Sequence, residues 1–359
     1  MSTRRGFLGG FTSGVACMAC GMKRASAQSR AARREVMVDG QRVRTVDIHC
    51  HCAIPETLEL VKGTPMERRV ASTTRSPQNN PPLEARIAEM DAEGIDVEAM
   101  SINAWWYGAD RDLARRIIDL QNEKLMKMCA LAPDRLVAFA SVSLQFPELA
   151  AEQLEIGMKQ QGLRGAAIGG TVEGQELSHP RFDPFWKKAE DLQALLFMHP
   201  QDSAAVTGVE SRVKGNGHLE NVIGNPLETT IAISHLIFEG VMDRFPNLKI
   251  SFAHGGGYLP AYADRMDYGC RASSGCPGPT PKLQPTEYLR KMYFDSLLFS
   301  PEALRHLVAV AGASQVMIGT DYNFGWVNDP VGHVMKTPGL SGADKSAILG
   351  GTAAKLLRL

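Results

Sequence analysis

The stretch Val46-Asp47-Ile48-His49-Cys50-His51 decides the fold of this chain. Its β-branched and apolar residues predict a buried strand. Because side chains alternate along a strand, we expect one face to carry Asp47, His49 and His51 and the other to carry Ile48, Cys50 and Cys52. The two imidazoles would then converge on one point, while Asp47 would lie deeper and orient a ligand. The stretch therefore predicts a metal site at the end of a strand.

Seven further apolar runs follow the first one, and amphipathic stretches separate them. The predicted strands cover 45–50, 97–102, 136–142, 165–168, 194–199, 249–254, 292–295 and 315–319. The predicted helices cover 83–93, 111–131, 147–161, 183–192, 229–244, 301–310 and 342–357. Continuous apolar strands are expected where protein covers both faces of a sheet. Eight strand–helix units in one chain predict an α/β protein with a single TIM (β/α)8 barrel over 46–359 that carries insertions at its mouth.

Two other segments are expected to be less regular. Residues 28–45 are polar and basic and predict an N-terminal arm or a short hairpin. Residues 62–82 are rich in Pro, Asn, Ser and Thr, and they follow the first strand, so we expect a loop over the barrel mouth. This loop and residues 201–221 are expected to shape substrate specificity.

Polar residues stand where three other strands end. His199 follows an apolar run at 194–198, His254 follows 250–253, and Asp321 follows 316–320. The strand ends of a barrel meet at its C-terminal face, where catalytic groups lie. Three imidazoles and a carboxylate suit a divalent ion such as zinc and leave one histidine for proton transfer.

Two neighbouring features have alternative interpretations. Trp105 and Trp106, just after the second strand, either wall a substrate pocket or pack their own loop. The run Gly255-Gly256-Gly257 either lets the backbone approach a ligand closely or forms a strand-to-helix turn.

The N-terminal residues 1–27 predict a twin-arginine signal peptide. Arg4-Arg5 precedes a mild apolar stretch, and Ala25-Ser26-Ala27 offers small residues for cleavage before Gln28. We therefore expect export to the oxidising periplasm, where Cys270 and Cys276 either pair or stay as free thiols.

Charge and hydropathy narrow the set of partners. Residues 1–27 hold four of the 39 basic residues and none of the 39 acidic ones, so the remainder carries a net charge of −4. Nucleic-acid binding would require a basic surface, and we expect no nucleic-acid partner. No apolar run after the signal reaches the roughly 18 residues that span a bilayer, so we expect no stable membrane insertion.

The first strand and several later stretches together resemble one known family. They include Arg86-Ile-Ala-Glu-Met-Asp-Ala-Glu-Gly94, Phe197-Met-His-Pro200, Gly224-Asn-Pro-Leu-Glu228, Ala253-His-Gly-Gly-Gly257 and Ile318-Gly-Thr-Asp-Tyr322. In these residues the chain resembles the amidohydrolase superfamily, and within it the aminocarboxymuconate-semialdehyde decarboxylase group, over nearly all of 45–357.

The resemblance implies a distorted TIM barrel that binds one divalent metal ion, zinc or manganese. The implied ligands are His49, His51, His199 and Asp321. His254 matches the catalytic histidine of the group, and Asp321 would assist it. Arg265 matches an arginine that reaches the active site of a neighbouring subunit and binds the substrate carboxylate, which implies a homodimer.

Several positions depart from the pattern of the group. Residues 164–169 lack the metal-bridging lysine of two-metal members, which favours one metal. A second substrate arginine has no clear counterpart, and Arg69 and Arg75 are the candidates. Asn221 or a neighbour replaces an aromatic residue, and Asn323 replaces a proline. These departures predict a substrate other than aminocarboxymuconate semialdehyde.

The sequence therefore predicts a metal-dependent, non-oxidative decarboxylase of an unsaturated or aromatic carboxylic acid. The alternative is a metal-dependent hydrolase of a lactone, an ester or an amide, because the same ligands can activate water. A hydratase and a non-catalytic binding protein are weaker alternatives.

Overall fold

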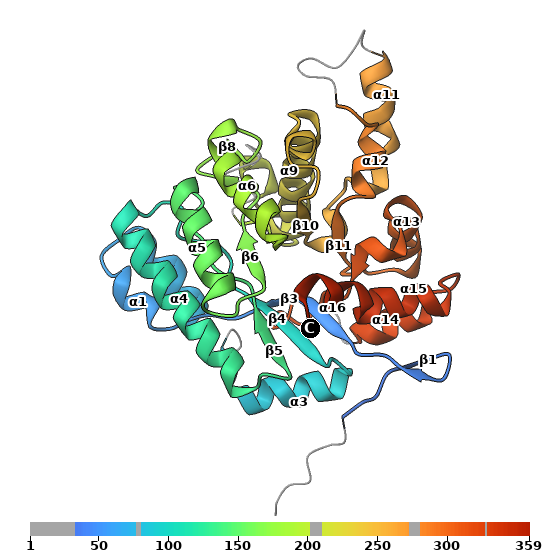
Figure 1. The fold of residues 1–359 in the computed structure, drawn as a ribbon, viewed down its shortest axis with the longest axis horizontal. Coiled ribbons are helices and arrows are strands. Elements are labelled where there is room, and N and C mark those ends of the chain that lie inside the picture. The colour runs from blue at the N-terminus through green and yellow to red at the C-terminus, as the bar shows by residue number, and fades with distance from the viewer. Residues whose placement is uncertain (1–32, 77–79, 202–209, 273–280, 327–328) are drawn as a thin grey trace, which may run out of the picture. The chain divides into compact units, whose positions relative to one another are not determined.

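The computed structural model describes residues 33–76, 80–201, 210–272, 281–326 and 329–359. Within these ranges eight parallel strands form a closed barrel, and helices lie around the strands (Figure 1). The strands are β3 (Val46–His51), β4 (Val97–Ser101), β5 (Leu136–Ala138), β6 (Gly165–Ile168), β9 (Leu195–Met198), β10 (Lys249–Phe252), β11 (Tyr293–Asp295) and β12 (Val316–Met317). One sheet has the order β3-β4-β5 and the other β12-β11-β10-β9-β6. Parallel bridges at Asp47–Ile318, Cys50–Tyr322 and Ala140–Ala166 join the two sheets. Each strand lies within one residue of a predicted strand at its start, and the predicted TIM barrel is confirmed.

The barrel interior is a separate apolar cluster. It contains Ile48, Phe139 and Phe197 together with residues of α16 (Thr352–Leu357). Arg358, at the end of α16, donates to the carbonyl of Leu192, just before β9 begins. The last helix therefore packs at the N-terminal ends of the strands, opposite the ends that carry the predicted ligands.

Helices surround the barrel, and five of them begin at a predicted residue and end within two residues of the predicted end. They include α3 (Leu83–Glu93), α4 (Arg111–Leu131), α5 (Pro147–Lys159), α6 (Asp183–Leu192) and α13 (Pro301–Ala311). The outer faces of the strands pack against these helices in the main hydrophobic core. Shorter helices are α1 (Thr57–Leu60), α8 (Glu210–Val213), α11 (Asp264–Ala272), α12 (Pro285–Leu289) and α14 (Pro330–Lys336).

Two predicted helices are divided in the structure. The segment 229–244 forms α9 (Asn225–Phe238) and α10 (Val241–Arg244), separated at Gly240, whose φ of 76° is left-handed. The segment 342–357 forms α15 (Gly342–Ser346) and α16 with a π-helical turn between them at Ala347–Gly351. In that turn a Cβ on Gly350 would collide with the carbonyl of Arg44, so tight packing against the start of β3 shapes this region.

A bulge in β3 corrects the predicted alternation of side chains. The pairing of β3 with β4 shifts register between Asp47 and Cys50. Carboxylate or thiol atoms of Asp47, Cys50 and Glu98 lie within 4.8 Å of one another. Ile48 instead packs inside the barrel. Asp47 therefore does not share a face with His49, because an extra residue in the strand reverses the alternation.

The segment expected to be an arm or a hairpin contains an antiparallel pair, β1 (Met37–Val38) with β2 (Gln41–Arg42). Asp96 attaches this pair to the barrel, because its buried carboxylate accepts two hydrogen bonds from Arg42, at 2.7 and 2.9 Å, and one from the backbone N–H of Thr45 at 2.8 Å. Burial opposes ionisation, but the hydrogen bonds from Arg42 hold the pKa of Asp96 below its ordinary value.

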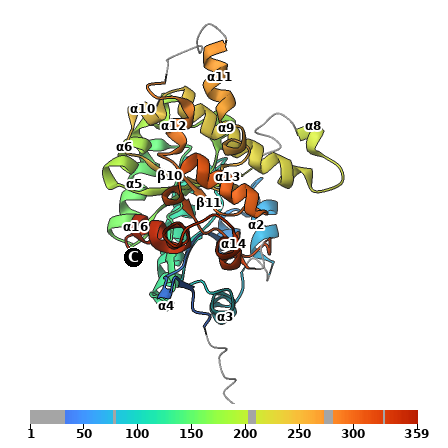
Figure 2. The ribbon, with the colours of Figure 1, turned by 90° about the vertical axis from the view of Figure 1, so that its right-hand side faces the viewer.

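The insertion after β3 differs from its prediction as a loop. It contains α2 (Glu67–Thr74), which buries Val70 against the core. A short antiparallel pair, β7 (Thr171–Val172) with β8 (Gln175–Glu176), follows β6. Helix α11 extends away from the barrel strands (Figure 2). None of the helices within the described ranges is long and apolar enough to cross a bilayer.

Candidate metal centre and active site

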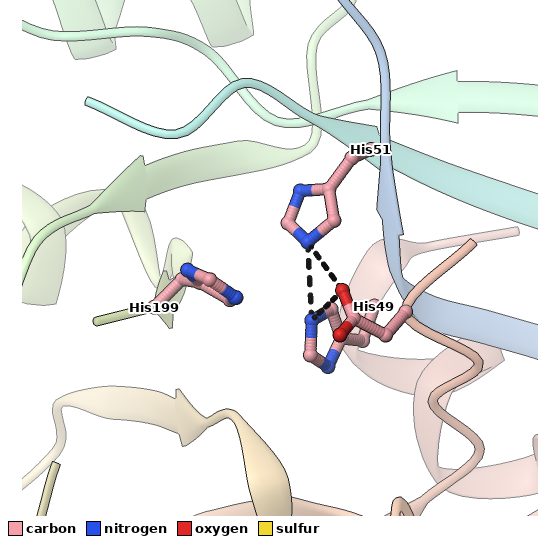
Figure 3. Close-up of side chains that lie close together, drawn as sticks. His49, His51 and His199 are labelled. Carbon is pink, nitrogen blue, oxygen red and sulfur yellow. Dashed lines mark hydrogen bonds and ion pairs between the residues drawn. The ribbon is translucent and has the colours of Figure 1, made fainter. Parts of the chain in front are cut away.

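Four side chains from three strand ends form a buried cluster at the C-terminal face of the barrel. The members are those predicted as ligands, namely His49, His51, His199 and Asp321, and one donor atom of each lies within 4.8 Å of the others. Nε2 of His51 lies 3.2 Å from Nε2 of His49 and 2.9 Å from Oδ1 of Asp321. Figure 3 shows the three imidazoles pointing into a common space. The structure thus brings the predicted ligands together.

Hydrogen bonds at Nδ1 fix the proton of each imidazole. Nδ1 of His49 donates to Asp295 at 2.6 Å, and Nδ1 of His199 donates to the carbonyl of Pro200 at 2.7 Å. The hydroxyl of Ser101 donates to the carbonyl of Cys50, so it accepts from Nδ1 of His51, which lies 3.1 Å away. With a proton on each Nδ1, each Nε2 faces the cluster and is the atom available to a metal ion. Neutral imidazoles held in this way are the form that binds a metal ion.

The charges in the cluster favour a bound cation. Burial, followed by the neighbouring imidazoles, lowers the pKa of His199 well below its ordinary value, and burial also lowers the pKa of His51. Burial opposes protonation of His49 as well, but Asp321 and Asp295 outweigh burial and raise its pKa to about 10. Despite burial, His49 keeps the pKa of Asp321 well below its usual range. The carboxylates thus favour positive charge here, and metal binding competes with a proton.

Asp295, at the end of β11, was not predicted to belong to the site. Its Oδ2 accepts hydrogen bonds from Nδ1 of His49 at 2.6 Å and from the backbone N–H of His254 at 2.8 Å. Its Oδ1 accepts from the backbone N–H groups of Gly255 at 2.8 Å and Leu297 at 3.1 Å. The strand-end position that identified the ligands also applies to Asp295, so the sequence did contain the signal.

Asp47 does not take the role predicted for it. Its carboxylate accepts from the backbone N–H of His49 at 2.9 Å and from the hydroxyl of Thr320 at 2.7 Å. The β3 bulge turns it away from the imidazoles, so it holds the backbone of the site, while Asp295 orients the ring of His49.

His254 lies beside the cluster and is more accessible than the four ligands. Its side chain is 18% exposed, and its Nε2 lies 3.7 Å from Oδ2 of Asp321. Nδ1 of His254 is buried without a hydrogen-bond partner among the described residues. His254 and Asp321 both have left-handed backbones, with φ of 56° and 55°. Such backbone angles are unfavourable for side-chain-bearing residues and gather at functional sites.

The glycine run after His254 serves a turn. Gly255, Gly256 and Gly257 all have positive φ, and a Cβ on Gly257 would collide with the carbonyl of Pro226 in α9. The close approach is therefore to the backbone of α9 and sets the direction of the chain after His254.

A cavity of about 420 Å³ opens beside the cluster. Its described walls are mostly apolar or amide side chains and include His254 and Asp321. The other lining residues are Asn221, Val222, Asn225, Pro226, Leu297, Phe299 and Trp326. They come from the π-helical turn Glu220–Gly224, the start of α9 and the loops after β11 and β12. The cavity is large enough for a single-ring ligand and ends on the candidate acid–base group.

The predicted substrate residues occupy different positions. Trp105 is half-buried and lines a smaller, second cavity that also contacts His51. Trp106 is fully buried, and its indole N–H donates to the carbonyl of Val142 at 2.9 Å, so it packs the core and lines neither cavity. For Trp106 this packing favours the interpretation as a packing residue over that as a wall of a substrate pocket.

The candidate arginines do not line the larger cavity within one chain. Arg265 is exposed on α11, with its guanidinium 5.8 Å from the ring centre of Tyr262. Arg69, in α2, donates to the carbonyl of Gln201 at 2.7 Å, and Arg75 is exposed at the end of that helix. The signal segment and the possible Cys270–Cys276 pair lie outside the residues and side chains that the structure describes.

The chain belongs to the amidohydrolase family, because the model of that family, described as Amidohydrolase, matches residues 46–359. It is 30% identical over 325 residues to 2-amino-3-carboxymuconate-6-semialdehyde decarboxylase from Dictyostelium discoideum, covering 88% of this chain and 84% of that protein. It is 29% identical over 329 residues to gamma-resorcylate decarboxylase from Rhodococcus jostii, covering 86% of this chain and 97% of that protein.

A solved structure shares the fold. Dihydroxybenzoic acid decarboxylase from Polaromonas, crystallised with manganese and the inhibitor 2-nitroresorcinol, superposes with a TM-score of 0.75 at 24% identity, over 88% of this chain and 97% of that one. These findings confirm the predicted resemblance and the prediction of a metal-dependent carboxy-lyase of this superfamily. The donor set of three Nε2 atoms and one carboxylate fits a divalent metal.

Proposed function

We propose that this enzyme removes the carboxyl group, without oxidation, from a small aromatic or unsaturated carboxylic acid. The observation that carries the proposal is the 420 Å³ cavity, which has Phe299 and Trp326 in its wall and ends on His254 and Asp321. Aromatic side chains suit a planar, unsaturated ring. The relatives named above support decarboxylation rather than hydrolysis.

The metal ligands and His254 have separate roles in the proposed reaction. A divalent metal ion, when bound by the four ligands, supplies positive charge that stabilises negative charge developing on the substrate. The bond between the substrate carbon and the carboxyl carbon breaks, and its electron pair stays on the substrate carbon. His254 is positioned to deliver the proton that replaces carbon dioxide, and its Nε2 lies 3.7 Å from Oδ2 of Asp321.

Release of carbon dioxide tests this proposal. Hydroxybenzoates and muconates should yield carbon dioxide with the metal-loaded enzyme, whereas cleavage of lactones, esters or amides without any release would contradict decarboxylation. His254→Ala should abolish turnover and keep the metal content. His235→Ala is a matched control, because His235 lies on α9, is exposed and pairs with Glu239. Full activity of the His254 variant would refute its role as the acid–base group.

We further propose one metal ion per chain, with zinc as the first candidate and manganese as the second. Three imidazoles and a carboxylate suit zinc, whereas the Polaromonas structure holds manganese. The other acidic group beneath the site contains Glu98, but Arg86 donates to this carboxylate at 2.5 Å and already neutralises it. Metal analysis of the purified protein should give about one equivalent, and two equivalents would overturn this proposal.

We propose a homodimer in which Arg265 completes the site of the neighbouring subunit. Its support is the resemblance of Arg265 to the family arginine and its exposed position on α11, away from its own cavity. Mixing inactive Arg265→Ala with inactive His254→Ala should restore part of the activity, because a mixed dimer contains one intact site. Sedimentation as a monomer, or a mixture without activity, would contradict this arrangement.

We propose export to the periplasm by the twin-arginine pathway, on the strength of Arg4-Arg5 and the small residues Ala25-Ser26-Ala27. Replacing both arginines with lysine should retain the protein in the cytoplasm of a bacterial host. Cell fractionation measures this, and unchanged export of the lysine variant would exclude the pathway.

A further inference from the structure

A second cavity of about 60 Å³ lies on the other side of the ligand cluster. It is lined by His51 and Trp105, by Thr73 and Thr74 of α2, and by Asn103 and Phe324 among others. The larger cavity reaches the cluster at Asp321 and His254, whereas this one reaches it at His51. A volume of this size holds several water molecules or one small substituent.

Several polar atoms of this second cavity are hydrogen-bond acceptors. Oδ1 of Asn103 is buried and has no hydrogen-bond partner among the residues that the structure describes. The hydroxyl of Thr74 donates to the carbonyl of Val70 at 2.7 Å, and the hydroxyl of Thr73 donates to the same carbonyl at 3.0 Å. Because each hydroxyl has a single proton, what both offer to the cavity is lone pairs.

Two further polar groups on this side, on His51 and Cys52, are already bonded. Nδ1 of His51 donates to the hydroxyl of Ser101, and Sγ of Cys52 lies 3.8 Å from the backbone carbonyl oxygen of Ser101. A buried acceptor without a hydrogen-bond partner costs free energy of folding. The unpaired Oδ1 of Asn103 beside a reactive centre therefore indicates a ligand that donates a hydrogen bond.

We propose that this cavity is a subsite for a hydrogen-bond-donating substituent of the substrate, a hydroxyl or an amino group, which Asn103 accepts and the ring of Trp105 flanks. A substrate that is centred on the ligand cluster would place its ring in the larger cavity and this substituent past His51. The inference rests on the proposed function for the identity of the substrate, but it adds which substituent is selected and by which residue.

The test compares substrates that differ only in a second hydroxyl. The values of kcat/KM for 2-hydroxybenzoate and for its 3-, 4-, 5- and 6-hydroxy derivatives are measured with the wild type, Asn103→Leu and Asn103→Asp. Leucine is similar in size but accepts nothing, so at least one dihydroxy acid should lose roughly tenfold more than 2-hydroxybenzoate, as expected for one lost hydrogen bond. Aspartate keeps an acceptor oxygen and should keep the preference.

The possible outcomes separate this inference from the function on which it rests. Equal losses for all five acids in the leucine variant would show a structural role for Asn103 and overturn the subsite. If none of the five acids releases carbon dioxide, calorimetry compares phenol with catechol, resorcinol and hydroquinone on the metal-loaded protein. The proposed function itself fails if muconates release no carbon dioxide either. A diol that loses affinity selectively in Asn103→Leu supports the subsite, and unchanged relative affinities refute it.

Discussion

Replacement of Asp295 with asparagine should weaken metal binding without changing any ligand. Each carboxylate oxygen accepts two N–H groups: His49 and His254 at Oδ2, and Gly255 and Leu297 at Oδ1. Whichever way the new amide is oriented, its NH2 group therefore faces two donors. His49 can relieve one clash by moving its proton from Nδ1 to Nε2, but that proton then occupies the atom that binds the metal.

The size of the effect follows from these contacts. The hydrogen bond from His49 is 2.6 Å long and fully buried. Burial raises the pKa of Asp295, but this bond, the charges of His49 and His254 and the N–H of Gly255 together hold that pKa below its ordinary value. Hydrogen bonds to charged groups contribute about 1.5–3 kcal/mol. Substitution of a residue that orients a metal ligand typically lowers metal affinity about 10- to 100-fold. We expect a loss in that range for Asp295→Asn.

Competition with a chelator measures the metal affinity, and Asp47→Asn is the matched control. Asp47 is also fully buried, and it accepts hydrogen bonds from the backbone of His49 and from Thr320. It does not contact an imidazole, so its replacement should lower stability and change metal affinity less than threefold, well below the range for a residue that orients a ligand. Equal losses of affinity in both variants, or none at Asp295, would refute the reasoning.

Other predictions concern the metal, the arm and the core. Chelation of the metal should lower the melting temperature, and restoring metal at 100 times its Kd should add about 2.7 kcal/mol of stability, visible by calorimetry. The pKa of Asp96 lies below its unfolded value, so its stabilisation is present above about pH 4 and is lost as the pH falls. Urea unfolding should therefore show a smaller difference between Asp96→Asn and wild type at pH 3 than at pH 7, where the variant should lose about 1–3 kcal/mol. Trp106→Ala should cost about 3–5 kcal/mol in the same assay, whereas Trp105→Ala should change KM more than stability, and the reverse pattern would contradict their assignment to core and cavity.

Most of the architecture could be predicted from the sequence, because the spacing of apolar residues and the residues that start or stop helices are local signals. The eight apolar runs lie on the eight strands, and α3, α4 and α6 begin and end at the predicted residues. The polar residues at strand ends, His199, His254 and Asp321, were recognisable for the same reason. Residues that follow the strands of a barrel in sequence lie together at its C-terminal face.

The rest depends on contacts between distant segments. The bulge that turns Asp47 away from His49 is a shift in the pairing of β3 with β4. The residues of β3 carry no sequence signal from which this shift could be predicted. The helix over 342–357 is interrupted where Gly350 packs against Arg44. Trp105 and Trp106 are identical neighbours in sequence, and only the fold places one at a cavity and the other in the core.

The left-handed backbone of His254 and Asp321 sets stability against activity at two positions. For a residue with a side chain this conformation costs about 1–2 kcal/mol, and glycine avoids that cost. Glycine at either position would therefore relieve the backbone, but it would remove the proposed proton donor or a proposed ligand. Mutational drift under selection for folding alone would thus erase the site first, while the barrel persisted. Among members of this fold, glycine at these two positions would identify a chain that still folds as the barrel but no longer catalyses the reaction.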